Sequence, residues 1–146
     1  MPRLVGKTMM NKTTCAWAGD DPVYHRYHDK EWGVPLHNDK TLFEFLILEG
    51  MQAGLSWITI LKKRDAFRKA FDNFDYNKVA KYNKAKTDRL MQDAGIIRNR
   101  LKIDGAVKNA QAYLRVREEF GTFNRYLWGY VDFTPIQNSR KSLQEV

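Results

Sequence analysis

The stretch LFEFLILEGMQAGLSWITILKKR, residues 42–64, decides the fold because it contains two amphipathic helices and the break between them. Apolar residues recur at helical spacing from Leu42 onward. Glu49 follows Leu42 by about two turns of a helix with roughly 3.6 residues per turn, so we expect its carboxylate to point where the core side chains point. A carboxylate in that position needs either a buried hydrogen-bond partner or a functional role.

The same periodicity runs through most of the chain. Gly50 and Gly54 are predicted to end the first helix, and Ser56 is a suitable cap for the second. No stretch shows the sustained alternation of a half-buried strand, so the predicted fold class is all-α. The predicted helices cover residues 39–51, 57–71, 77–82, 86–94, 99–119 and 123–131.

Length and composition limit the possible classes of protein. The 146 residues suffice for one core, and we expect a flexible N-terminal arm over 1–14 followed by a single helical domain over 15–146. No apolar run approaches the roughly 20 residues of a membrane span, and the N-terminus lacks a signal-peptide core. The single cysteine is typical of a reducing compartment, so the expected localisation is cytoplasmic.

The positive charge is concentrated in one part of the chain. The formal net charge is +8, and residues 78–117 contain eleven lysines and arginines against three aspartates. One interpretation is a solvated helical face. The other is a phosphate-binding surface, since clustered cations release the counterions condensed on nucleic acid.

The stretch DAGIIRNRLKI, residues 93–103, lies inside this basic window. Gly95 is expected to adopt the left-handed backbone that ends a helix, and Ile96 to be buried in the turn. The N-terminal amides of the next helix would then form a phosphate clamp with nearby cations. This arrangement resembles a helix-hairpin-helix DNA-binding element, and its candidate cations are Arg98, Arg100 and Lys102.

The stretch CAWAGDDPVYHRYHDKEWGVP, residues 15–35, is rich in aromatic and turn residues. We expect an irregular segment whose aromatic side chains form a stacking surface. Cys15 and His28 are possible zinc ligands, although their spacing matches no common zinc finger. From spacing alone, a buried thiol and a surface histidine remain the simpler alternative.

Together these three stretches resemble the 3-methyladenine DNA glycosylase I family, from about Cys15 to about Pro135. The resemblance implies an all-α member of the helix-hairpin-helix glycosylase superfamily that is short at its C-terminus. It implies a monofunctional DNA repair enzyme that flips 3-methyladenine out of alkylated double-stranded DNA and hydrolyses its N-glycosidic bond, acting as a monomer. A non-catalytic module that binds DNA remains the alternative.

The resemblance also implies roles for particular residues. Glu49 matches the carboxylate that accepts hydrogen bonds from the flipped base, and the Gly54–Leu55 break matches the wedge that fills the gap in the duplex. We identify no lysine of the pocket stretches as a Schiff-base nucleophile, so strand cleavage is not expected. The aromatic residues that match the family's base pocket are Trp17, Tyr24, Tyr27 and Trp57.

A structural zinc ion is the cofactor that the resemblance implies. In the family, a C-terminal segment supplies a His and a Cys that complete a site with the residues matching Cys15 and His28. This sequence ends at Val146, before that segment, so we expect an incomplete site with these two ligands.

Overall fold

A computed structural model describes residues 14–145, and every regular element in that part of the chain is helical. The all-α prediction is therefore confirmed, while most of the predicted arm 1–14 lies outside the described residues. None of the described helices is both long enough and apolar enough to cross a bilayer. In chain order the elements are η1 (Ala16–Ala18), α1 (Pro22–Lys30), α2 (Asp39–Gln52), α3 (Trp57–Ala70), η2 (Asp72–Phe74), α4 (Tyr76–Val79), α5 (Lys84–Leu90), α6 (Arg100–Phe120), α7 (Phe123–Gly129) and η3 (Leu143–Glu145).

Contacts divide the chain into two compact units, with the boundary between Val34 and Pro35. In the described residues the first unit contains η1 and α1, and the second contains the helices from α2 onward. The single domain expected over residues 15–146 stays a prediction.

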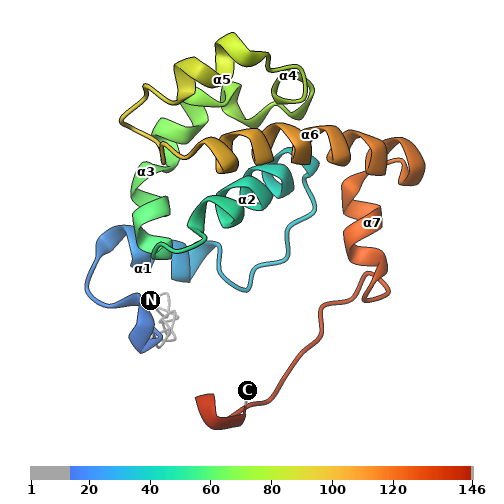
Figure 1. The fold of residues 1–146 in the computed structure, drawn as a ribbon. Coiled ribbons are helices and arrows are strands. Elements are labelled where there is room, and N and C mark those ends of the chain that lie inside the picture. The colour runs from blue at the N-terminus through green and yellow to red at the C-terminus, as the bar shows by residue number, and fades with distance from the viewer. Residues whose placement is uncertain (1–13, 146) are drawn as a thin grey trace, which may run out of the picture. The chain divides into compact units, whose positions relative to one another are not determined.

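The long helix α6 is the centre of the second unit. Figure 1 shows α4 and α5 on one side of α6 and α2 on the other, and α6 contacts all three as well as α7. The core between α2, α3 and α6 is closely filled, because its side chains are almost completely buried. Its largest fully buried members on these helices include Phe43, Ile47, Leu48, Met51, Ile60, Phe67, Ile103 and Tyr113.

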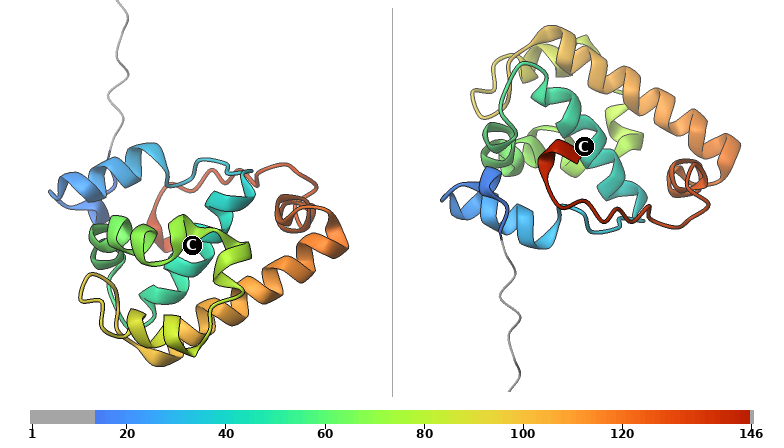
Figure 2. Two further views of the ribbon diagram at one scale, coloured as in Figure 1. Left: turned by 90° about the horizontal axis from the view of Figure 1, so that it is seen from above. Right: turned by 90° about the horizontal axis from the view of Figure 1, so that it is seen from below.

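Helix α7 packs across the end of α6. In both views of Figure 2 it is seen almost end-on while α6 runs across the page, so the two helices cross steeply. The junction is tied by Asp39 at the start of α2, whose carboxylate accepts hydrogen bonds from the amides of Phe123 (3.0 Å) and Asn124 (2.8 Å). Arg117 of α6 donates to the same carboxylate over 2.7 Å. One side chain thus connects three helices.

The break between α2 and α3 occurs later than predicted. Gly50 lies inside α2, which continues to Gln52, so the prediction that Gly50 breaks the helix is wrong. One glycine inside a helix costs only about 1 kcal/mol relative to alanine, and tertiary packing exceeds this cost. Gly54 has φ +76°, a left-handed conformation that side chains rarely adopt, and it makes the turn.

The first unit contains a helix where we expected an irregular segment. Helix α1 begins with Asp21 as its cap, whose side chain accepts a hydrogen bond from the amide of Val23. Pro22 occupies the first helical position, where its missing N–H has no cost. Asp followed by Pro is a recognised start signal, and the aromatic composition of the segment obscured it.

Candidate functional site

Two carboxylates of α2 have opposite environments. Glu44 is only 7% exposed, and Arg68 of α3 donates to it from both Nη2 (2.7 Å) and Nε (3.1 Å). Glu49 is exposed and has neither a hydrogen-bond partner nor an ion pair within residues 14–145. The buried, satisfied carboxylate of this helix is therefore Glu44, and Glu49 is free to accept hydrogen bonds from a ligand.

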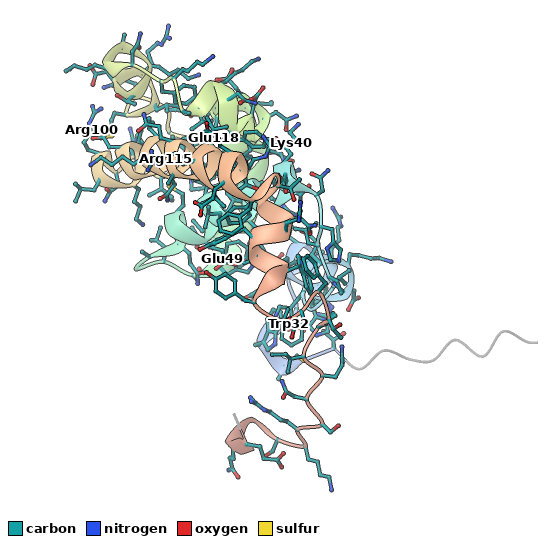
Figure 3. All side chains as sticks on the ribbon, turned by 90° about the vertical axis from the view of Figure 1, so that its right-hand side faces the viewer. Trp32, Lys40, Glu49, Arg100, Arg115 and Glu118 are labelled. Atoms are coloured by element: carbon teal, nitrogen blue, oxygen red, sulfur yellow. The ribbon has the colours of Figure 1, made fainter. Side chains whose placement is uncertain are left out.

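The expectation that Glu49 points into the core is wrong, although its angular position on α2 matches that of Leu42. Burial also depends on position along the helix axis. The start of α7 packs against the first turn of α2 through Asp39. Along the axis of α2, Glu49 lies about 10 Å beyond Leu42, at about 1.5 Å per residue, and so further from the contact with α7. Figure 3 shows it below α6, on the flank of the second unit.

Trp57 lies on the same side of α2 as Glu49. The ring of Trp57 stacks on Phe45 with centroids 6.4 Å apart and planes inclined by 30°. Phe45 and Glu49 are four residues apart, so their side chains share one face of α2. Trp57 itself is only 8% exposed and Phe45 is half-buried, so Phe45 is the more accessible ring. The second unit thus brings this ring and an exposed carboxylate to one face, a combination that suits a flat cationic ligand.

The turn between α2 and α3 presents an apolar side chain outward. Leu55 directly follows the left-handed Gly54 and is 40% exposed. Its amide donates to the carbonyl of Gln52 over 2.6 Å, which closes the turn tightly. A leucine at the tip of a rigid turn, between Glu49 and Trp57 in sequence, has the geometry of a wedge.

The aromatic residues of the first unit form one cluster around Trp17. The rings of Tyr24 and Tyr27 meet Trp17 edge-on, with centroids 5.0 Å and 6.4 Å away. Trp32, which the sequence did not assign to the site, packs against Trp17 at 5.1 Å and stacks on His28 at 5.5 Å. The predicted base-pocket residues of this unit therefore come together, and the only sequence signal for Trp32 is its place in the same aromatic run.

The possible zinc ligands also meet within the first unit. Nε2 of His28 accepts a hydrogen bond from the amide of Cys15 over 3.2 Å, and Nδ1 lies 2.9 Å from a carboxylate oxygen of Asp29. A carboxylate on Nδ1 is the usual support of a metal-ligating histidine, so His28 fits a ligand role. Its Nε2, however, accepts from the backbone amide of Cys15 and not from the thiol. In the described chain, no group of three or more His, Cys, Asp or Glu side chains could hold a metal.

The connection from α5 to α6 differs from our expectation at Gly95. Ile96 is buried, as predicted. Gly95, however, is not among the residues with positive φ, so the predicted left-handed turn there is wrong. A Cβ at this position would lie 3.0 Å from the Cβ of Ala66 and 3.0 Å from Oδ1 of Asp93. Glycine is needed because the hairpin passes directly over α3.

The three candidate cations of the hairpin have different partners. Arg100 donates to Asp88 (2.7 Å) and Thr87 (3.2 Å) on α5. Lys102 donates to two backbone carbonyls at the end of α2. Arg98 is exposed and has no ion-pair partner in the described part of the chain. Arg98 is thus the cation of this set most available to an external phosphate.

Comparisons with known proteins show the family of this chain. The profile of the methyladenine glycosylase family matches residues 17–146. The chain is 46% identical over 134 residues to the DNA-3-methyladenine glycosylase of Haemophilus influenzae, covering 92% of this chain and 72% of the relative. It is 47% identical over 132 residues to DNA-3-methyladenine glycosylase 1 of Escherichia coli, covering 90% and 71%.

Solved structures give the same result. The fold is similar to a crystal structure of a variant of 3-methyladenine DNA glycosylase I in complex with 3-methyladenine, with a TM-score of 0.87 and 41% identity. That similarity covers 91% of this chain and 72% of the other.

Proposed function

Because the chain belongs to the methyladenine glycosylase family, whose named members are hydrolases acting on N-glycosyl bonds, we propose that it removes 3-methyladenine from alkylated DNA. The observation that carries this proposal is Glu49, an exposed carboxylate without a partner in the described chain, beside the stacked rings of Phe45 and Trp57. This face supplies the negative charge and the aromatic surface that recognise a cationic flat base.

Charge explains how such a site would distinguish damaged from normal adenine. Methylation at N3 gives the base in DNA a positive charge, whereas adenine is neutral. Bringing the Glu49 carboxylate against a neutral base would cost its hydration without a compensating ion pair. The same positive charge makes 3-methyladenine a good leaving group, so binding and orientation supply most of the catalysis needed.

Base flipping is the proposed route to the site. A base stacked in a duplex is inaccessible, and extruding it costs a few kcal/mol. Leu55, held outward by the left-handed Gly54, would fill the space that the base leaves and offset part of this cost. Tyr24, Tyr27 and Trp17 of the first unit are proposed to contact the flipped base, as the family resemblance implies.

The reaction is proposed to be monofunctional, with water attacking the sugar. Segment 48–57, which carries Glu49 and Trp57, contains no lysine that could form a Schiff base. Release of the free base with an intact abasic strand is the expected outcome.

Contact with DNA is assigned to the helix-hairpin-helix element that we propose for α5, α6 and their connection. Gly95 and Ile96 shape the hairpin, and Arg98 is its exposed cation. The proposed partner is double-stranded DNA, bound by one copy of the chain. The single cysteine is consistent with work in a reducing cytoplasm.

Zinc is proposed as a structural ion held partly by Cys15 and His28. Asp29 would orient the imidazole, and the thiolate would supply the second ligand. With only these two protein ligands the ion would stabilise the first unit slightly at most, and it would take no part in the chemistry.

The test of the proposed function is release of free 3-methyladenine from methylated duplex DNA by the purified chain. In the variant Glu49→Gln we expect the excision rate to fall tenfold or more, since each ~1.4 kcal/mol of lost transition-state stabilisation is a factor of ten. The control is Glu118→Gln, which removes the same charge at an exposed position of α6 and should keep the wild-type rate.

The outcomes separate the two classes of function. Release of base by wild type and loss in Glu49→Gln support the glycosylase. Tight binding to methylated DNA without base release would instead identify a non-catalytic module. Equal excision rates in wild type and Glu49→Gln would remove Glu49 from the site.

A further inference from the structure

We propose that Lys102 is a positioning residue, which holds the wedge turn between α2 and α3 against the start of α6. This inference rests on the proposed function, because it assigns the turn a role in base excision. It gives Lys102 a task within the protein in place of the phosphate contact that its position in the hairpin predicts.

The geometry of the contact is specific. Nζ of Lys102 lies 2.8 Å from the carbonyl oxygen of Met51 and 2.7 Å from that of Ala53. If α2 continued, the Met51 carbonyl would accept from the amide of Leu55, but that amide donates to Gln52 instead. The last carbonyls of a helix carry its partial negative charge, so an ammonium is well placed to satisfy them. Both hydrogen bonds are charge-assisted and therefore stronger than neutral ones.

The contact joins two segments that are far apart in sequence and that both belong to the proposed DNA-binding surface. Ala53 begins the turn that displays Leu55, and Lys102 follows the hairpin that displays Arg98. Two of the three ammonium donors of Lys102 are directed at carbonyls, which leaves at most one for a phosphate. The hairpin and the wedge are consequently coupled through this side chain.

The surface between α2 and α6 is hollowed at this end. A groove of about 260 Å³ runs there, lined by Ile47, Gly50 and Met51 on α2 and by Leu101, Gly105 and Ala106 on α6. The two glycines carry no side chain that could bridge the groove. Lys102 also lines the groove, and its ammonium makes a polar connection to the carbonyls at the end of α2.

Positioning by Lys102 has a direct consequence for excision. The turn sets the direction of Leu55 and the relative placement of Glu49 and Trp57, which lie on either side of it. A displacement of about 1 Å in a catalytic arrangement can cost on the order of a hundredfold in rate. Loosening the turn would thus impair base extrusion and excision, while general attraction to DNA would persist.

The test compares Lys102→Met, Lys102→Arg and the control Lys108→Met. Methionine keeps the aliphatic bulk and removes the donors, while arginine can still donate to both carbonyls. Lys108 is an exposed lysine of α6, so its replacement removes the same charge and leaves the turn alone. Three quantities are measured: hydrogen exchange of the amides in residues 53–57 in free protein, single-turnover release of 3-methyladenine, and the salt dependence of binding to undamaged duplex.

We expect Lys102→Met to speed exchange of the turn amides and to slow excision at least tenfold, with the salt slope unchanged. In Lys102→Arg, exchange of the turn amides and the excision rate should both stay within about threefold of wild type. In Lys108→Met, both quantities should match wild type. If Lys102→Met does not fold, Lys102→Gln replaces it with the same expectation, since one shorter amide cannot satisfy both carbonyls.

Three results would overturn the proposal. Unchanged exchange at the turn would show that the contact does not hold it, whether or not the protein excises any base. Faster exchange with normal excision would show that the position of the turn does not matter. A salt slope lowered by about one unit would identify Lys102 as a phosphate contact. Failure of the wild-type chain to release base contradicts the proposed function alone, because the exchange measurement needs no substrate.

Discussion

Asp39 shows how one side chain can make the fold dependent on pH. Burial alone would raise the pKa of its carboxyl group. Hydrogen bonds from the amides of Asn124 and Phe123, together with Arg117, outweigh burial and hold the pKa below its ordinary value. A carboxyl group with a lowered pKa in the folded state stabilises that state above the unfolded pKa of about 4. This stabilisation is lost as the pH falls through the folded pKa.

We therefore expect Asp39→Asn to lower the free energy of unfolding by about 1–3 kcal/mol at pH 7, because charge-assisted hydrogen bonds are replaced by neutral ones. The difference from wild type should shrink as the pH falls below about 4. Denaturant unfolding at a series of pH values measures it. The control Asp65→Asn changes a carboxylate that is 91% exposed and should have little effect. A difference that is constant with pH would contradict the assignment to the Asp39 charge.

At the level of single residues, sequence reasoning identified types of side chain better than their surroundings. Glu49 was singled out from its spacing, but spacing gives an angle around a helix and cannot say where along the helix neighbours end. The buried carboxylate is Glu44, whose partner Arg68 lies 24 residues further on. The position of Lys102 in the basic hairpin predicts a phosphate contact. The carbonyls that it binds instead lie about 50 residues earlier in the chain. Such long-range pairs leave no local pattern.

At the scale of the elements, we expect the hairpin between α5 and α6 to contact the DNA backbone. Arg98 should contact a phosphate, while Arg100 is engaged by Asp88. In Arg98→Ala we expect weaker binding to damaged and undamaged duplex alike, with the salt slope reduced by about one unit for one lost contact. Titrations at several salt concentrations measure the slope.

The matched control for Arg98→Ala is Arg115→Ala. Arg115 is exposed and lies toward the other end of α6, roughly 22 Å beyond Arg100 at about 1.5 Å per residue (Figure 3). Its replacement should leave the slope unchanged. Equal reductions in both variants would mean that charge acts over the whole helix and that the hairpin has no special role.

The α-helices of the second unit were predictable because their signals are local. Asn38 caps α2, Asn99 caps α6 and Thr122 caps α7, each through its own side chain and an amide three residues later. Gly95 was recognised as a special position, but the reason for it was not. The closeness of Ala66 is a tertiary contact, and only the folded arrangement of α3 and the hairpin shows it.

At the scale of the whole molecule, zinc binding can be measured independently of base excision. Cys15 and His28 offer zinc one thiolate and one imidazole, whereas a closed structural site has four ligands. With two protein ligands the ion should be held loosely and should contribute little to folding. We expect less than one zinc per chain after dialysis against a weak chelator, measured by elemental analysis.

Thermal unfolding gives a second measurement of how tightly the chain holds zinc. Added zinc should raise the unfolding temperature of the 146-residue chain only slightly, and Cys15→Ser should abolish the small increase. One tightly held zinc per chain, or a large increase that persists in Cys15→Ser, would show that other residues complete the site.

The central place of α6 also has a consequence for how the protein is made. Ribosomes deliver the chain from its N-terminus, so α2 emerges before Ile103, Ala106 and Tyr113 of α6, the helix that packs against it. Until residue 120 or so has been synthesised, the apolar face of α2 has no complete partner and stays exposed to other chains. Folding of the second unit during translation must therefore wait for α6, and until then the exposed apolar face makes the nascent chain prone to aggregate.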